Sequence, residues 1–232
     1  MMWDHLVAEA PRFFTYWNLR FLVLAGLTTL ALSFTGCILG GAAGLAFASV
    51  RLTRSAPLGP VRVIATLYIE IFRRVPFLVT LMLVFFAFQL AGIELPLFVI
   101  GAISVFLIAS AFLAEIIRGG MLAVHRNQWD AAETMNFTLI QALRHVVLPQ
   151  AWRVILPPAF GFFVLFIKDT ALASQIGVVE LTYAGKVLNN RGFSATLSFG
   201  SILVLYFMMS FPLTRLGAYL EARLAPARNP RA

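Results

Sequence analysis

The chain has 232 residues, of which 60% are hydrophobic and only 12% are charged, and its mean hydropathy is +0.88. A soluble domain cannot hide that much apolar surface, so these values exclude an ordinary soluble protein and predict an integral membrane protein. The net charge of +8 does not indicate nucleic acid, because the basic residues are scattered among apolar stretches, as in the cytoplasmic loops of membrane proteins. The single cysteine, Cys37, lies in an apolar run and excludes an internal disulfide.

Residues 1–20 are predicted to form an interfacial segment on the periplasmic side. The segment contains aromatic residues of the kind that settle at the headgroup level: Trp3, Phe13, Phe14, Tyr16 and Trp17. It carries both acidic and basic residues and no basic leader, so we expect no signal peptide.

The first membrane span is expected at about 21–50. Gly36, Gly40 and Gly44 recur there every four residues, which predicts a smooth strip against which a second helix packs closely. Lining of a pore is the alternative interpretation of this strip.

The second apolar stretch, about 61–92, is interrupted by charged residues and a proline. A straight helix would place Glu70, Arg73 and Arg74 inside the membrane, at roughly 2.5–3.5 kcal/mol for each charge near the centre. We therefore predict an elbow: an interfacial helix to about Arg74, a break before Pro76 and a span over 76–91. The charges would anchor the elbow at the headgroups or, alternatively, line an access path.

Three further spans complete an all-α polytopic protein with about five transmembrane helices. They are expected at about 96–118, 150–168 and 198–218, within a transmembrane domain of residues 21–222 that is followed by a basic tail, 223–232. Outside the ambiguous arginines of the elbow and Arg153, ten basic residues fall on one side and five on the other. The positive-inside rule then predicts an outer N-terminus and a cytoplasmic C-terminus.

A polar segment, 127–149, interrupts the apolar pattern between the third and fourth spans. Acidic residues come first (Asp130, Glu133) and basic residues last (Arg144, His145), which suits the two ends of a helix. Apolar residues recur at helical spacing: Phe137, Ile140, Leu143, Val146 and Val147. The pattern predicts a folded amphipathic helical pair on the cytoplasmic side, and a solvated surface helix is the alternative.

Motifs of catalysis and metal binding are missing from the sequence. There is no HExxH, and His5, His125 and His145 do not form a ligand cluster. The pair Gly185-Lys186 has Glu180 where a phosphate-binding loop needs its first glycine. We expect a non-enzymatic chain that binds no cofactor itself.

Ionisable residues inside spans are candidates for function. We predict that Lys168 binds a substrate carboxylate and that Asp169 or Glu115 binds the ammonium group, with Thr170 and Ser174 nearby. Gly177 and the small residues of 171–174 predict a broken helix, which exposes backbone polar groups. The alternative is that Lys168, Asp169 and Glu115 only pair with one another.

Four blocks of sequence resemble the polar amino-acid group of ABC importer permeases. The polar segment is similar to the EAA loop of that family, with Gln128, Asp130-Ala131-Ala132, Asn136 and Leu148-Pro149-Gln150-Ala151 at its motif positions. The other blocks are YIEIFRRVPFLVTL (68–81), AFLAEIIRGGMLAV (111–124) and FIKDTALASQIGVVELT (166–182). Asp130 replaces the usual Glu, and Asn136 replaces a glycine that joins two short helices. Asn tolerates the left-handed backbone region, so the turn can survive.

The resemblance implies a permease subunit of an ATP-driven amino-acid importer in the bacterial inner membrane. The coupling residues would be Gln128, Asp130, Ala131, Ala132, Glu133, Asn136, Leu148 and Pro149. The implied partners are two cytoplasmic ATPase subunits that bind ATP and Mg, a second permease copy or homologue, and an extracytoplasmic solute-binding protein. Two alternatives remain at this point: an ion-coupled secondary transporter, and a membrane scaffold that does not transport.

Overall fold

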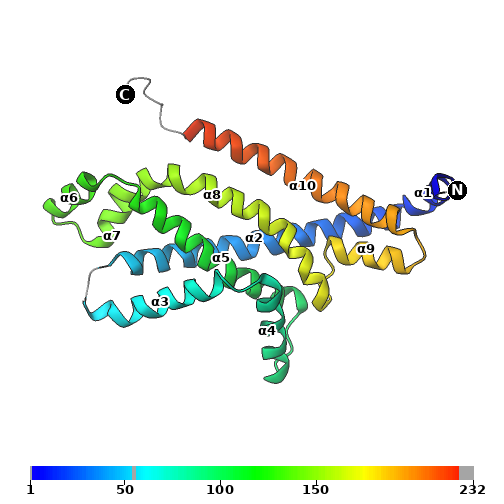
Figure 1. The fold of residues 1–232 in the computed structure, drawn as a ribbon, viewed down its shortest axis with the longest axis horizontal. Coiled ribbons are helices and arrows are strands. Elements are labelled where there is room, and N and C mark those ends of the chain that lie inside the picture. The colour runs from blue at the N-terminus through cyan, green and yellow to red at the C-terminus, as the bar shows by residue number, and fades with distance from the viewer. Residues whose placement is uncertain (1, 54–55, 225–232) are drawn as a thin grey trace. The chain divides into compact units, whose positions relative to one another are not determined.

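The computed structural model describes residues 2–53 and 56–224, with side chains from residue 8 onward except at position 56. This part of the chain is helical and contains no strand. The helices, shown in Figure 1, are α1 (Met2–Phe13), α2 (Tyr16–Leu52), η1 (Ala56–Leu58), α3 (Gly59–Phe72), α4 (Phe77–Leu90), α5 (Leu97–Leu122), α6 (Arg126–Thr134), α7 (Leu139–Ala142), η2 (Leu143–Val147), α8 (Leu148–Asp169), η3 (Thr170–Ile176), α9 (Leu181–Asn190) and α10 (Ala195–Leu224). Of the predicted basic tail, only Arg223 and Leu224 fall in the described part.

The apolar helices agree with the predicted spans. Among the described residues, four stretches are long and apolar enough to cross a membrane: α2, α5, the continuous run 139–176 and α10. The pair α3 and α4 qualifies as a fifth span only as a bent pair. The break between them, from Arg73 to Pro76, lies where the sequence predicts it, because Pro76 cannot continue the helix that ends at Phe72.

The chain divides into two compact units. Unit 1 comprises residues 1–36, 76–105 and 164–212, and unit 2 comprises residues 37–75, 106–163 and 213–232. The long helices α2, α5, α8 and α10 contribute residues to both. Each unit has its own packing, described separately below.

Unit 1 is built around Phe13, the last residue of α1. Its side chain is fully buried with Leu22, Ala25, Leu181, Ala184, Leu188 and Ile202, and its ring meets that of Phe193 edge-on at 5.2 Å. Asn18 Nδ2 donates a hydrogen bond to the Phe13 carbonyl, at 3.0 Å. The prediction that Phe13 lies at the lipid interface is therefore wrong, because the turn after α1 directs its ring into the core. Phe14, Tyr16 and Trp17 are exposed, and their placement at the headgroup level stays a prediction.

Unit 2 depends on a close contact between α2 and α5. A Cβ on Gly40 would lie 2.7 Å from the Cβ of Ala109, and one on Gly44 would lie 2.8 Å from the backbone nitrogen of Ala114. Both distances are too short for real atoms, so only glycine allows the two backbones to approach this closely. The predicted packing role of the glycine strip is confirmed at these two positions.

Helix α3 packs against the same pair of helices within unit 2. Ile69 of α3 is buried with Ala111 and Ala114 of α5. The Tyr68 ring lies 5.0 Å from that of Phe47, and the Tyr68 hydroxyl donates to the Leu107 carbonyl at 3.0 Å. One face of α3 is thus bound to two spans, which a helix floating at the headgroups would not require.

Replacement of the helix-contact glycine should destabilise the protein, whereas replacement of a neighbouring glycine should not. We expect Gly44→Ala to lower the free energy of unfolding by roughly 1–3 kcal/mol, because the methyl group meets the α5 backbone. Gly41→Ala is the matched control, since its Cβ would meet only the Leu113 side chain at 3.6 Å. Thermal unfolding of the purified proteins in detergent measures the difference. Equal midpoints for the two variants would show that the α2–α5 contact is not limiting.

Candidate functional site

The polar segment folds as two short helices, α6 and α7, and each is capped at its N-terminus. His125 Nδ1 accepts the Asn127 N–H at 3.3 Å where α6 begins. At the start of α7, the Thr138 N–H donates to Gln141 Oε1 at 2.9 Å and the Gln141 N–H donates to Thr138 Oγ1 at 3.4 Å. This reciprocal pair is a capping box, which satisfies N–H groups that a helix start leaves unpaired. The predicted helical pair is therefore present.

The connection between α6 and α7 requires a left-handed residue, and Asn136 supplies it. Its φ is 54°, the only positive φ among the described residues that are not glycine. The Asn136 N–H donates to the Glu133 carbonyl at 2.9 Å and the Phe137 N–H to the Ala132 carbonyl at 3.1 Å. These two bonds define a Schellman C-cap, in which the residue after the cap is left-handed. Asn136 therefore supplies a left-handed geometry that a glycine would also adopt without strain.

A direct hydrogen bond joins the beginning of the EAA-like segment, at Gln128, to its end, at Gln150. Gln150 Nε2, in the first turn of α8, donates to Gln128 Oε1 of α6 at 3.1 Å and to the Val146 carbonyl at 2.9 Å. Between α7 and α8 the helix widens to a π-helical turn, η2, a feature that often marks functional segments. The polar segment therefore forms a closed unit rather than a flexible loop.

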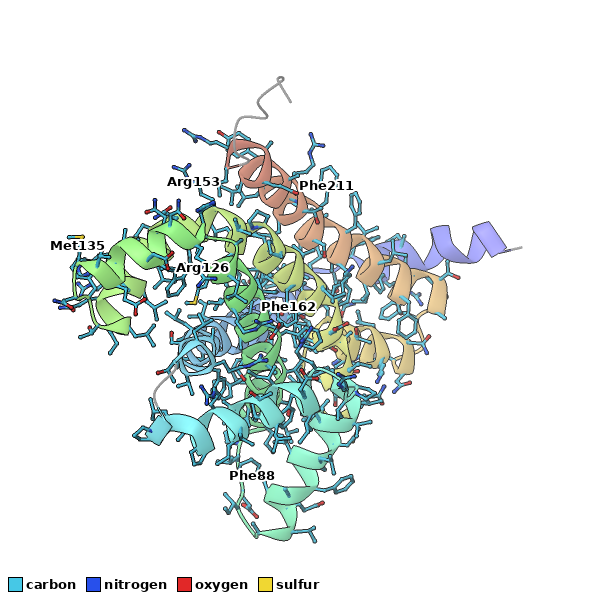
Figure 2. All side chains as sticks on the ribbon, turned by 60° about the vertical axis from the view of Figure 1, so that its left-hand side comes forward. Phe88, Arg126, Met135, Arg153, Phe162 and Phe211 are labelled. Carbon is cyan, nitrogen blue, oxygen red and sulfur yellow. The ribbon has the colours of Figure 1, made fainter. Side chains whose placement is uncertain are left out.

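One face of the helical pair is buried and the other is exposed. The buried side consists of Ala132, Ala142, Leu143 and Val147. On the opposite side, Met135 is 66% exposed and Ile140 is 75% exposed, beside the exposed Asp130, Ala131 and Glu133. Figure 2 shows Met135 at the outer end of the helical pair. Of the two predicted contact alanines, only Ala131 is available to a partner.

A cavity of about 760 Å³ opens beneath α6 within unit 2. Its walls come from the end of α2, the start of α3, the end of α5 and the helical pair: Arg51, Leu52, Thr53, Arg62, Leu122, Val124, Arg126, Trp129, Asp130, Glu133, Phe137, Leu139 and Ala142. Arg62 Nη1 of α3 donates to the Thr53 carbonyl at 2.7 Å, a hydrogen bond that links α3 to the residue after α2. Sequence reasoning does not find this cavity, because its walls are far apart along the chain.

Glu115 lies in unit 2, in contact with arginines. Arg51 Nη1 donates to Glu115 Oε2 at 2.6 Å, and Arg118 Nε lies 3.1 Å from both carboxylate oxygens. A third guanidinium, that of Arg73, is 4.0 Å away. The sequence predicted Glu115 as a candidate for the cargo ammonium group, with mutual pairing of Glu115, Lys168 and Asp169 as the alternative; Lys168 and Asp169 belong to unit 1. It missed Arg51, which precedes Glu115 by 64 positions.

The other four predicted substrate residues belong to unit 1, at the end of α8 and in η3. Lys168 is exposed, Asp169 is half-buried, and Thr170 and Ser174 are buried. Thr170 Oγ1 donates to the Ile167 carbonyl at 2.8 Å and Ser174 Oγ to the Ala171 carbonyl at 2.7 Å. The predicted broken helix takes the form of a tightened 3₁₀ segment, η3, that stops at Gly177 with φ 94°.

The sequence did not single out Glu180 as a buried carboxylate, although its side chain has structural contacts in unit 1. It is fully buried in unit 1 and accepts the N–H groups of Thr182 and Tyr183 at 2.9 and 2.7 Å and the Tyr206 hydroxyl at 2.8 Å. Burial raises the pKa of Glu180, while these hydrogen bonds act in the opposite direction. The carboxylate caps α9 and ties it to α10, so its role is structural.

An all-helical chain of apolar spans, interrupted by a rigid, capped helical pair, has the architecture of a polytopic membrane permease. Comparisons with known proteins agree. The family model described as "Binding-protein-dependent transport system inner membrane component" matches residues 40–226. The chain belongs to this family and is a permease subunit of an ABC transporter.

Individual relatives carry amino-acid transport in their names. The probable glutamine ABC transporter permease protein GlnM of Bacillus subtilis (strain 168) is 30% identical over 78% of this chain and 82% of its own length. The L-cystine transport system permease protein TcyB of the same organism is 34% identical over 75% and 74%. The crystal structure of an amino acid ABC transporter with histidines has 30% identity and a TM-score of 0.79, covering 88% of this chain and 94% of that chain.

The joint at position 136 should tolerate glycine and reject a β-branched residue. We expect Asn136→Gly to preserve the free energy of unfolding to within a few tenths of a kcal/mol. Asn136→Val should lower it by roughly 1–2 kcal/mol, because Val strongly disfavours the left-handed region. Thermal unfolding in detergent measures both, with hydrogen exchange of residues 126–147 as the local probe. Equal exchange in the two variants would contradict the role of the positive φ.

Proposed function

We propose that this chain is the membrane-spanning subunit of a bacterial inner-membrane importer for a polar amino acid, driven by a separate ATPase that docks on the α6–α7 pair. The observation that carries the proposal is the doubly capped helical pair with one exposed face. Family membership makes the chain a transport permease. The ATPase partner and the amino-acid cargo go beyond family membership and are part of this proposal.

The exposed face of the helical pair suits a protein partner. Met135 and Ile140 are large apolar side chains held in the open beside Asp130 and Glu133. Such a mixture supplies apolar contact area together with directional charge contacts to basic groups. Ala131 leaves room for close approach. ATP and Mg would bind to the partner, which would also perform the hydrolysis.

The local geometry also suits transmission of a force. Helix α5 is followed by α6 after a three-residue connection, 123–125, and α8 follows η2 without a break. The Gln128–Gln150 hydrogen bond ties the two sides together. A partner that pulls on the helical pair would therefore move the ends of α5 and α8. A flexible loop at this place would absorb the motion instead.

The charge distribution supports a cytoplasmic placement of this face. Arg51, Arg62, Arg118, Arg126 and Arg144 all lie in unit 2, close in sequence to the ends of α2 and α5 or to the helical pair. The positive-inside rule then directs the pair to the cytoplasm, the N-terminus outward and the C-terminus inward. We infer a complete transporter of two permease subunits, two ATPases and an extracytoplasmic solute-binding protein.

The cargo site is proposed at the end of α8 in unit 1. Lys168 is exposed and suited to a carboxylate, and the half-buried Asp169 beside it suits the ammonium group. Between the two acidic candidates, Asp169 is preferred, since Glu115 is bound by Arg51 and Arg118. Thr170 and Ser174 bond to their own backbone and would shape the wall.

Charge reversal on the helical pair should abolish ATPase binding. We expect Asp130→Lys and Glu133→Lys each to reduce co-purification of the ATPase at least tenfold, because they place like charges against its basic groups. The control is Glu94→Lys, the same change at an exposed position between α4 and α5. Affinity purification from membranes, with immunodetection of both subunits, measures the ratio. Undiminished co-purification of the two loop variants would refute docking at this face.

Loss of the Lys168 ammonium should weaken cargo binding. In the complete transporter, reconstituted in proteoliposomes, we expect Lys168→Ala to raise the apparent KM for amino-acid uptake about tenfold or more, since a charge-assisted hydrogen bond is lost. Arg191→Ala, which removes an exposed cation of the same unit, is the control. Unchanged apparent affinity, together with unchanged substrate-stimulated ATPase activity, would exclude a cargo contact at Lys168.

A further inference from the structure

A group of charged residues in unit 2 carries more positive than negative charge. It consists of four arginines and two glutamates, a net charge of +2: Arg51, Arg73, Arg74, Arg118, Glu70 and Glu115. These residues come from the end of α2, from α3 and the break that follows it, and from α5. Uncompensated charge among apolar spans is costly, so the location of the excess is informative.

The Glu115 carboxylate is already fully engaged. Arg118 bonds to both of its oxygens through Nε and to Oε1 again through Nη2, while Arg51 binds Oε2. Two guanidinium groups therefore share one carboxylate. Arg73 lies farther away, with Nη1 4.0 Å from Glu115 Oε2, which is too long for a hydrogen bond.

The second glutamate of the group, Glu70, forms an ion pair with Arg74. Glu70 Oε2 accepts from Arg74 Nε at 3.1 Å and from Arg74 Nη2 at 2.6 Å, a pairing one helical turn apart on α3. The pair is exposed, with 77% of the Arg74 side chain and 40% of the Glu70 side chain accessible. Arg74 thus has a local partner, and the two adjacent arginines differ sharply in environment.

Arg73 carries one of the two excess positive charges, and the other belongs to the group of Arg51, Arg118 and Glu115. Its guanidinium makes no hydrogen bond within residues 8–53 and 57–224 and lies 5.8 Å from the centre of the Phe112 ring. That ring is stacked on Phe162 at 5.2 Å. The side chain is 35% exposed, so its donors are accessible while its position is fixed by the aromatic surface. The end of α3 favours a cation, but it leaves these donors unused.

We infer that Arg73 binds the carboxylate group of the amino-acid cargo, at a stage of transport other than the one served by Lys168. The inference rests on the proposed import of amino acids. A planar guanidinium with free, parallel N–H groups matches a carboxylate in bidentate geometry. The stacked aromatic pair beside it offers an apolar surface to the rest of the cargo.

The position of Arg73 and Glu115 relative to the end of α5 indicates the stage of transport at which Arg73 would bind cargo. Glu115 lies seven residues before Leu122, the end of α5, which is roughly 10 Å along the helix axis. Because α5 leads into the proposed ATPase-binding pair, this end of unit 2 faces the cytoplasm. Arg73 therefore serves the cargo shortly before release.

The test compares Arg73 with Arg74 in the complete transporter, with its ATPase and binding protein, in proteoliposomes. The probe is a mixture of ¹⁴C-labelled L-amino acids, followed by kinetics with the amino acid that the wild type takes up fastest. We expect Arg73→Gln to raise KM about tenfold or more with ATPase activity retained, and Arg73→Lys to recover part of the loss. Arg74→Gln should stay within twofold of the wild type.

Three other outcomes would overturn the assignment. If Arg73→Gln and Arg74→Gln both keep the wild-type KM, neither arginine contacts the cargo. A fall in kcat and ATPase activity at constant KM would indicate a structural role for Arg73. If only the dependence of uptake on the vesicle content of phosphatidylglycerol changes, the residue binds an anionic lipid headgroup instead. Absence of any uptake by the wild type would contradict the proposed function itself, a result distinct from these three.

Discussion

The close contact of α2 with α5 is the constraint on which unit 2 depends. Gly40 and Gly44 allow the two backbones to approach to a distance that no side chain would permit. Two turns beyond Gly44, the same contact brings Arg51 to Glu115, and α3 then adds Ile69 against Ala111 and Ala114. Backbone proximity, the ion pair and the third helix are thus successive consequences of a short glycine pattern. The walls of the cavity beneath α6 begin where this contact ends, at Arg51 and Leu52.

The helical pair has a different origin, since its form is set almost entirely by local hydrogen bonds. The capping box at Thr138, the Schellman bonds around Asn136 and the Gln128–Gln150 contact all lie within or beside the segment. A segment that holds its own shape can bind a partner without first becoming ordered, which reduces the entropic cost of association. The same rigidity allows force on α6 to reach α8 with little loss. Met135 and Ile140 are exposed on this segment and would supply apolar contact area to the proposed partner.

The features that sequence predicted correctly are those written in short-range patterns. The break before Pro76, the packing role of Gly40 and Gly44 and the left-handed Asn136 each follow from the chemistry of a single residue or a fixed spacing. The failures concern partners that are distant in the chain. Arg51 binds Glu115, α9 and α10 help to bury Phe13, and the Tyr206 hydroxyl donates a hydrogen bond to Glu180. No local pattern encodes these contacts, because they arise only when separate helices pack.

The distance between Arg73 and Glu115 has a consequence for the affinity of the inferred cargo site. A carboxylate bound to Arg73 would share the neighbourhood with the negative charge of Glu115, whose oxygen is 4.0 Å from the guanidinium. Two like charges this close weaken the binding of the incoming one, although Arg51 and Arg118 offset part of the repulsion. A transport site must bind its cargo strongly enough to admit it and weakly enough to let it leave. An arginine that lies near a resident glutamate without a hydrogen bond to it meets both conditions, and an arginine with no carboxylate nearby would retain the cargo longer.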